Sequence, residues 1–307
     1  MQRRPRRARE PAKLGTTWLG RGPLRNALPP VTPLSQDQIE AIHDASLRIL
    51  EEIGIEFQGA AACELLRKAG AMVEVKSGLT RIPRELVMQV LKSAPAEFTL
   101  TPRNPERAIH VGGNHISFGL VAGPPNVHDC VSGRRPGNHA DYVSLIKLAQ
   151  SFDIIHFIGN QPTAPQELPA RTRHLDCYLA NILYSDRVYH CTAIGRERAL
   201  DGIDMMALSR GLTREQMADS PGVLTIISVN SPRRFDAAMS DGLMAMAEFG
   251  QAVVVTPFTL MGAMAPVSLA AALTQQNAEA LAGITLSQLP TPGAPVVYGA
   301  FTSDVDM

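Results

Sequence analysis

The sequence predicts an α/β fold of the (β/α)8 TIM-type barrel class, because short apolar segments alternate with amphipathic helices after residue 112. About six of the eight strand–helix units are recognisable, behind an N-terminal α+β cap and an extended basic arm. Continuous apolar segments are typical of strands buried on both faces, as in parallel sheets. Hydrophobic residues make up 45% of the 307 residues and charged residues 19%, which is enough apolar material for a large core.

Residues 1–34 are rich in Arg, Pro and Gly and show no periodicity, which predicts a flexible, extended arm. A solvated arm is the simplest interpretation of its many basic residues. Docking against an acidic partner or a neighbouring subunit is the alternative. Because barrels with long N-terminal arms often associate, we also expect a homo-oligomer.

Residues 35–112 form the predicted α+β cap. Ser35 and Gln38 have the spacing of a capping box, and the helix that they begin ends at Gly54, where a left-handed residue belongs. Apolar residues between them recur at helical spacing. Two shorter helices are expected at residues 60–68 and 83–93, with short extended pieces at residues 72–75 and 80–82.

Residues 113–307 form the predicted incomplete barrel. A doubly wound sheet also fits strand–helix alternation, but V-A-G-P-P-N follows the first strand where a dinucleotide fold has G-x-G-x-x-G, so the barrel is favoured. Because six strands leave open sheet edges, we expect a chain truncated at its C-terminus. The expected strands are 116–120, 154–158, 188–193, 223–229, 253–256 and 296–298, and the expected helices are 138–152, 170–184, 196–210, 233–249 and 267–289.

Charge and composition limit the classes of function that we expect. The formal net charge is zero, with 29 basic and 29 acidic residues, which gives no reason to expect a nucleic-acid partner. No apolar stretch is long enough to cross a membrane and no signal peptide is recognisable, so we expect a cytoplasmic protein. The four cysteines are scattered and the histidines show no paired spacing, so no metal site is predicted.

Several segments, in their order along the chain, resemble the trimethylamine methyltransferase (MttB-like) family. No single motif is diagnostic, but the match is colinear over nearly the whole chain from Ser35. The segments are S-Q-D-Q-I-E-A-I-H-D-A-S-L-R-I-L-E-E-I-G-I at 35–55, R-I-P-R-E-L-V at 81–87, R-N-P-E at 103–106, G-R-R-P at 133–136, A-P-V-S-L-A at 265–270, L-A-G-I-T-L-S-Q-L at 281–289, P-G-A-P-V-V-Y-G at 292–299 and S-D-V-D-M at 303–307.

The resemblance implies a (β/α)8 barrel that holds a methylated amine at its C-terminal mouth. A separate corrinoid protein then presents Co(I), which takes a methyl group from the amine. This chain itself would bind no cofactor directly, because the corrinoid (cobalamin) is carried by the partner protein. Trimethylamine-specific members carry pyrrolysine, whose segment would lie beyond Met307, whereas other members act on quaternary amines such as glycine betaine, proline betaine or carnitine. The alternatives are a barrel lyase or aldolase, and a non-catalytic truncated fragment.

The expected substrate-binding residues lie at the C-terminal ends of the predicted strands, where barrel enzymes place their sites. A quaternary ammonium accepts no hydrogen bond, so aromatic faces and polarised oxygens hold it best. No residue is assigned a catalytic role, and S-P-R-R at 231–234 is expected to begin a helix, with Ser231 as its N-cap. The candidates are Phe118, Asn126, Asn160, Gln161, Asn230, Thr256, Phe258, Tyr298 and Phe301, and the four aromatic residues among them are proposed to form one cage.

Overall fold

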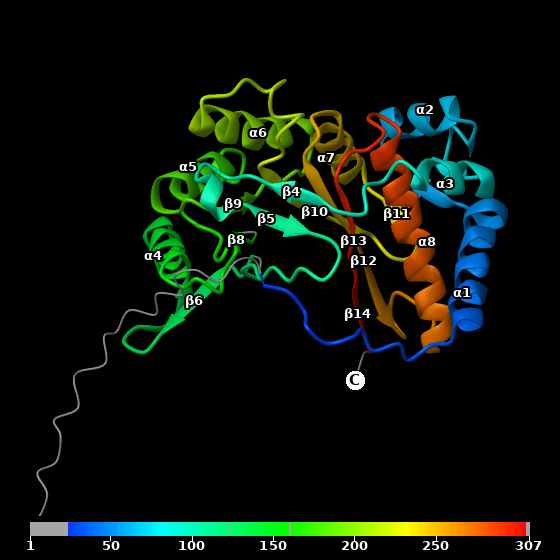
Figure 1. The fold of residues 1–307 in the computed structure, drawn as a ribbon, viewed down its shortest axis with the longest axis horizontal. Coiled ribbons are helices and arrows are strands. Elements are labelled where there is room, and N and C mark those ends of the chain that lie inside the picture. Colours follow the sequence, from blue (N-terminus) through cyan, green and yellow to red (C-terminus); the bar gives the residue numbers. More distant parts are fainter. Residues whose placement is uncertain (1–23, 122, 160, 305–307) are drawn as a thin grey trace, which may run out of the picture.

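The computed structural model describes residues 24–121, 123–159 and 161–304 (Figure 1). A twisted parallel sheet crosses the molecule, helices cover one of its faces, and the N-terminal cap packs at one end (Figure 1). The expected Asn160 and most of the expected arm lie outside the described residues.

The order of the parallel strands in space follows their order along the chain. The sheet runs β8-β9-β10-β12-β13, every neighbouring pair is parallel, and β14 pairs with β12 beyond β13. A doubly wound sheet would reverse direction at a switch point, and the described strands show no reversal. The sheet is an open path. The strands are β8 (Phe157–Ile158), β9 (Val188–His190), β10 (Val223–Val229), β12 (Ala252–Met261), β13 (Val296–Tyr298) and β14 (Phe301–Asp304).

The predicted strand at 116–120 is wrong in extent. Within it, only Gly119 makes a bridge, parallel to Phe157 of β8. A Cβ at residue 119 would lie 2.2 Å from the Phe157 ring, so this close approach requires glycine. An unpredicted hairpin, β6 (Asn126–Asp129) with β7 (Gly133–Pro136), follows and projects from the body of the molecule (Figure 1).

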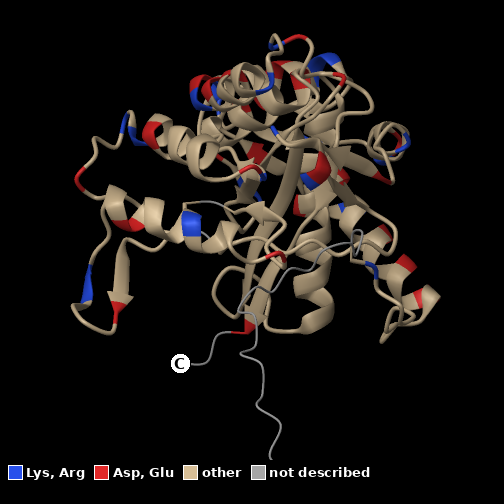
Figure 2. Ribbon diagram, turned by 60° about the vertical axis from the view of Figure 1, so that its left-hand side comes forward, with Lys and Arg blue, Asp and Glu red and all other residues tan. Residues whose placement is uncertain are grey.

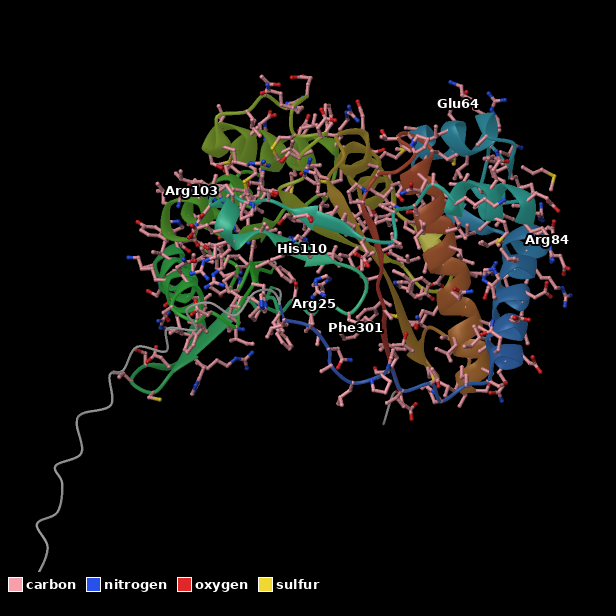
Figure 3. All side chains as sticks on the ribbon, in the orientation of Figure 1. Arg25, Glu64, Arg84, Arg103, His110 and Phe301 are labelled. Atoms are coloured by element: carbon pink, nitrogen blue, oxygen red, sulfur yellow. The ribbon has the colours of Figure 1, made fainter. Side chains whose placement is uncertain are left out.

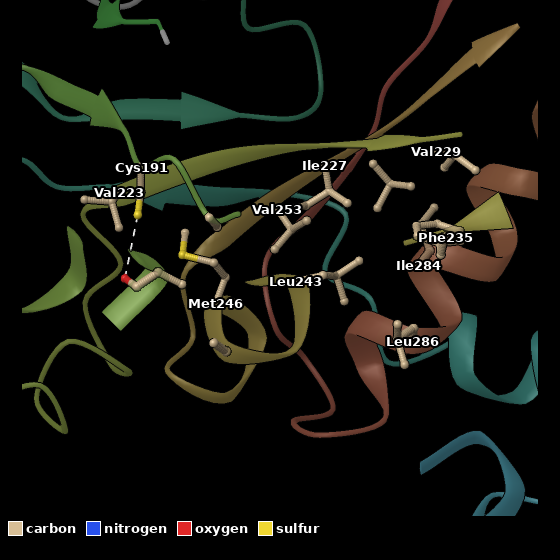
Figure 4. Close-up of a cluster of buried hydrophobic side chains, with 14 of the residues drawn as sticks. Cys191, Val223, Ile227, Val229, Phe235, Leu243, Met246, Val253, Ile284 and Leu286 are labelled. Carbon is tan, nitrogen blue, oxygen red and sulfur yellow. Dashed lines mark hydrogen bonds between the residues drawn. The ribbon is translucent and has the colours of Figure 1, made fainter. Parts of the chain in front are cut away.

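Five helices cover the outer face of the sheet, and their positions confirm the predicted strand–helix alternation. Between the two layers lies the main core, in which strand residues such as Ile227 and Val253 meet Leu243 and Met246 (Figure 4). Lys and Arg are interspersed with Asp and Glu over the surface helices and loops of the molecule (Figure 2). The helices are α4 (His139–Gln150), α5 (Arg173–Tyr184), α6 (Arg196–Arg210), α7 (Ala237–Glu248) and α8 (Leu269–Gln288).

Helix α7 begins later than predicted, and Ser231 is not its N-cap. Asp236 caps the helix instead, since its carboxylate accepts the Met239 amide at 2.7 Å. The preceding residues form a loop with a cis Ser231–Pro232 bond and a short strand, β11 (Arg234–Phe235).

A second hairpin covers the inner face of the sheet, opposite the helices, near the N-terminal ends of its strands. It consists of β4 (Phe98–Leu100) and β5 (Ile109–Val111), joined through a short 3-10 turn at Pro105–Arg107. Leu100 and Ile109 pack against the strand residues Val188, Leu224 and Ala252. The inner face is therefore closed near the N-terminal ends of the strands and open near their C-terminal ends.

The cap confirms its predicted helices within a few residues. The capping box of Ser35 and Gln38 is present, and Gly54 has a φ of 87°. A small sheet of order β11-β1-β3-β2 holds the cap to the β10–α7 loop, and the Phe57 and Phe235 rings stack across it at 5.1 Å. The cap elements are α1 (Gln36–Arg48) with a π-helical turn (Ile49–Ile53), β1 (Ile55–Phe57), α2 (Ala60–Lys68), β2 (Met72–Val73), β3 (Leu79–Arg81) and α3 (Arg84–Leu91).

Helix α8 is buried on almost all sides, between the sheet, α7 and the cap. Its buried Gln288 accepts hydrogen bonds from the Ser93 hydroxyl and the Gly293 amide and donates one to the Ala294 carbonyl, at 2.8–3.1 Å. In the part of the chain that the structure describes, no helix has the length and apolar character needed to cross a bilayer.

His190 extends the pairing between β9 and β10 past the end of β9. The backbone register stops at His190 opposite Leu224, and the imidazole Nε2 then accepts the Ile226 amide at 3.0 Å. Nδ1 must therefore carry the proton of the neutral ring. The side chain is 4% exposed, and this burial lowers the pKa of His190 to about 4.

We predict that His190 makes the protein less stable in acid. An unfolded histidine takes up a proton near pH 6.5, whereas folded His190 does so only near pH 4, so the unfolded chain binds more protons between these values. The free energy of unfolding should fall by on the order of 3 kcal/mol as the pH drops through this window. Urea titrations across the window should show a shallower fall for His190→Gln, which keeps an acceptor for the Ile226 amide. His128→Gln, at an exposed position, should behave as the unaltered protein does, and parallel curves for His190→Gln would contradict the prediction.

Candidate functional site

Three of the candidate residues share the inner face of the sheet at its C-terminal end. Thr256 and Phe258 are two residues apart on β12, so both point to the face opposite the helices. The register pairs Phe258 with Phe301 of β14. The two phenyl rings stack with centroids 4.6 Å apart and planes 6° from parallel. Phe301 is 53% exposed, so the pair presents an aromatic face to the space above the sheet.

Tyr298 lies on the other face. The register places it beside Val255, which points toward the helices. Its hydroxyl donates to the side-chain Oδ1 of Asn277 on α8 at 3.3 Å and accepts from the side-chain Nε2 of Gln276 at 3.5 Å, and burial raises the pKa of Tyr298. The structure therefore does not bring Tyr298 to the Phe258–Phe301 pair.

Phe118 lies beside β8, at the opposite end of the sheet from β13. Its ring stacks on His156 with centroids 6.1 Å apart, and its amide donates to the His156 Nδ1 at 2.9 Å. Burial lowers the pKa of His156. The proposed cage of four aromatic residues is thus divided among three places, because strand register and pleat, rather than position near a strand end, decide which rings meet.

The described amide candidates, Asn126, Gln161 and Asn230, lie in the β6–β7 hairpin, after β8 and after β10. The Gly123 amide donates to the Gln161 carbonyl at 2.7 Å, which joins the base of the β6–β7 hairpin, where Asn126 lies, to the loop after β8. Asn230 is exposed at the end of β10, and its side-chain amide lies 3.4 Å from the Asp236 carboxylate. Asn126 therefore lies at the base of the β6–β7 hairpin, and Asn230 lies in the turn that follows β10.

A buried carboxylate fixes the loop between β10 and α7, and the sequence interpretation missed it. Glu279 of α8 has no exposed surface and accepts hydrogen bonds from the Ser231 hydroxyl at 2.6 Å and the Arg233 amide at 2.8 Å. Burial raises the pKa of Glu279, and these hydrogen bonds oppose the rise. The sequence does contain a signal for this site, because Glu279 is an acidic residue in the middle of an apolar helix.

The loop that Glu279 holds contains one residue in an unfavourable backbone conformation. Arg233 has a φ of 52°, in the left-handed region that favours glycine. Its guanidinium donates to the Gly54 carbonyl at 2.8 Å, and Arg234 forms an ion pair with Glu56 at 3.1 Å. The end of β10 is therefore tied both to α8 and to the cap.

Two cavities lie away from the phenyl pair. One of about 510 Å³ lies in the cap and is lined by Cys63, Glu64 and Lys76, and Figure 3 shows Glu64 far from Phe301. The other, of about 250 Å³, lies between α1 and α8 and includes Tyr298. Over the described ranges, no three His, Cys, Asp or Glu side chains come together as a metal site would require.

We predict that Glu279→Ala loosens the β10–α7 loop. The Ser231 hydroxyl and the part-buried Arg233 amide lose their acceptor, which should cost about 1 kcal/mol of unfolding free energy. Urea unfolding measures that loss, and hydrogen exchange should show the Arg233 amide exchanging faster. Glu64→Ala, which removes an exposed ion pair on α2, should leave both measurements unchanged. Unaltered protection of the Arg233 amide in Glu279→Ala would contradict the role given to Glu279.

The chain matches known proteins over most of its length. It is 39% identical over 280 residues to a glycine betaine methyltransferase of Desulfitobacterium hafniense (strain Y51). It is 29% identical over 288 residues to a proline betaine:corrinoid methyltransferase of Eubacterium limosum, and 27% identical over 276 residues to a trimethylamine methyltransferase, MttB, of Desulfitobacterium hafniense (strain DSM 10664 / DCB-2). These matches cover 89–91% of this chain but only 55–58% of the relatives, so the chain spans little more than half their length.

The family model described as trimethylamine methyltransferase (MTTB) matches residues 1–307. This match covers the cap, the parallel sheet and the helical layer together, in agreement with the resemblance that the sequence motifs predicted. The chain belongs to the trimethylamine methyltransferase family.

Proposed function

We propose that this chain provides the amine-binding part of a methyltransferase that moves a methyl group from a quaternary amine to the Co(I) of a corrinoid protein. The observation that carries the choice of amine is the order of the identities. The chain is 39% identical to a glycine betaine methyltransferase but 27% identical to a trimethylamine methyltransferase. A betaine is therefore favoured over trimethylamine as the substrate class.

The fold that we propose for the complete protein is a closed (β/α)8 barrel with this sheet as part of its wall. Sequential parallel strands with helices on one face are the arrangement that a barrel repeats. The relatives have further length in which the remaining strands would lie. We propose that the chain is divided into an arm (residues 1–34), a cap (residues 35–112) and a barrel segment (residues 113–307).

The stacked phenyl pair suits a quaternary ammonium. Such a cation offers no hydrogen-bond donor, and the negative face of an aromatic ring attracts it. The Phe258–Phe301 stack presents such a face, and Thr256 supplies a hydroxyl oxygen one pleat earlier on β12. Asn126, Asn160, Gln161 and Asn230 are proposed to line the same mouth, and the amide groups of such residues suit the carboxylate of a betaine.

We propose that a partner protein presents the corrinoid, because the chain is similar to a proline betaine:corrinoid methyltransferase. The mouth fits an acceptor that arrives from outside, since Phe301 and Asn230 are exposed. The cobalt would supply the nucleophile when the partner is bound. This chain would hold the ammonium, direct one methyl group outward and exclude water from the apolar faces of the ligand.

The described residues do not support the alternative function of a barrel lyase or aldolase. A Schiff-base mechanism needs a lysine at the C-terminal end of a strand. The lysines of the described ranges are Lys68, Lys76, Lys92 and Lys147, and each lies on a helix or a cap turn, or at a helix end. We also propose a cytoplasmic location and self-association.

We predict that the aromatic face of Phe301 determines betaine affinity. Phe301→Leu keeps an apolar side chain but removes the ring, so the dissociation constant for glycine betaine should rise about tenfold, which corresponds to about 1.4 kcal/mol. Phe301→Trp keeps an aromatic face and should bind within about threefold of the unaltered protein. Isothermal titration calorimetry measures both constants.

Methyl transfer tests the function itself. The unaltered protein, incubated with a Co(I) corrinoid protein, should methylate the cobalt faster with glycine betaine than with trimethylamine. Equal affinities for the Leu and Trp variants would contradict the aromatic role of Phe301. Absence of cobalt methylation with every tertiary and quaternary amine tested would contradict the proposed reaction.

A further inference from the structure

The β6–β7 hairpin stands at the end of the sheet where the proposed substrate site lies. The chain enters the hairpin after Gly119, which bridges Phe157 of β8 in parallel, and leaves it for α4. The base of the hairpin is hydrogen bonded to the loop that leads from β8 to α5. Both segments therefore connect the parallel sheet to the next helix, and such connections lie at the C-terminal ends of the strands. The hairpin is thus part of the rim of the mouth.

Close contacts fix the base of the hairpin to that loop. The Ala164 amide donates to the Pro124 carbonyl at 3.0 Å, and the Gln166 amide donates to the Gly137 carbonyl at 2.9 Å. A Cβ at residue 137 would lie 2.0 Å from the Oγ1 of buried Thr163, so this close approach requires glycine. The direction in which the hairpin projects from the body (Figures 1 and 2) is therefore set by the fold.

The turn at the tip of the hairpin is ordered but uncovered. The Asp129 carboxylate accepts hydrogen bonds from the Val131 amide at 2.9 Å and the Ser132 amide at 2.6 Å, which hold the turn in one conformation. The Val131 side chain is nevertheless 95% exposed. A turn that is already ordered loses little conformational entropy when a partner covers it. The tip therefore suits contact with another molecule.

One face of the hairpin is exposed and positively charged. The register pairs His128 with Arg134, and strand alternation puts the two side chains on the same face. Both are exposed, and within the described ranges neither side chain has an ion pair or a hydrogen bond. The Asp129 carboxylate lies on the opposite face, where Arg135 binds it together with Asp141. The exposed face therefore carries a positive charge that no carboxylate of the described chain neutralises.

We propose that this face of the β6–β7 hairpin, with Val131 at its tip, docks an acidic surface of the corrinoid protein. The inference rests on the proposed function, because a cobalt that takes a methyl group at the mouth must approach across the rim on which the hairpin stands. Opposite charges across an interface guide the partner to it and set its orientation. A second copy of this chain fits the face less well, because a two-fold contact would bring one Arg134 toward the other.

The test measures binding of the full chain to a cobalamin-loaded corrinoid protein that the unaltered chain methylates. Arg134→Glu reverses the charge of the face, so the dissociation constant for the corrinoid protein should rise about tenfold. Added salt should weaken binding of the unaltered protein more than binding of Arg134→Glu, because the variant has lost the attraction that salt screens. Biolayer interferometry at low and high salt measures both effects. The dissociation constant for glycine betaine should be unchanged in the variant, which shows that its fold and substrate site are intact.

Two further variants make the result specific. Val131→Asp places a carboxylate at the tip and should also weaken binding of the corrinoid protein. Lys76→Glu is the matched control, since Lys76 is an exposed cation on the turn of another hairpin, β2–β3 of the cap, and it should bind as the unaltered protein does. Unchanged binding of Arg134→Glu or of Val131→Asp, or equal weakening by Lys76→Glu, would overturn the docking surface.

The outcomes separate this inference from the proposed function. If the unaltered chain methylates no corrinoid protein with any amine, the proposed function fails and the docking surface with it. If cobalt methylation proceeds and Arg134→Glu has the same KM for the corrinoid protein as the unaltered chain, the docking surface alone is wrong. Sedimentation equilibrium tests the other occupant, because a lower molar mass for Arg134→Glu with unchanged corrinoid-protein binding would place a second copy of this chain on the face and overturn the proposal.

Discussion

The hydrogen bonds made by polar side chains on the buried helix α8 hold the two parts of this molecule together. A buried donor or acceptor without a partner is costly, so these groups permit few alternative arrangements. Glu279 binds the β10–α7 loop, and Gln288 binds the end of α3 and the turn before β13. The Ser46 hydroxyl of α1 donates to the Thr274 carbonyl at 2.9 Å. The cap, the sheet and the helical layer therefore share one helix as their common support.

The candidate site depends on this support from a distance. The Thr302 hydroxyl donates to the Gln276 side chain of α8, which fixes β14 and hence the Phe301 ring against Phe258. The same helix holds the loop that follows Asn230. The mouth of the sheet is thus built from strands and loops whose positions are set on the opposite, helix-covered side. Such indirect support is a usual way to keep a binding surface rigid while it stays open.

The sequence by itself determined the strand–helix order, the bounds of α2, α6, β10 and β13, and the capping box at Ser35, because these depend on local periodicity and short-range hydrogen bonds. It also placed Phe258 and Phe301 among the site candidates. Only the tertiary structure decided that Tyr298 turns toward α8, that Ser231 binds Glu279 rather than capping α7, and that Arg234–Phe235 joins the cap sheet. Each of these depends on a partner far away in the sequence, namely a strand register, a buried carboxylate or a neighbouring edge. Local pattern carries no information about such partners, and packing alone selects them.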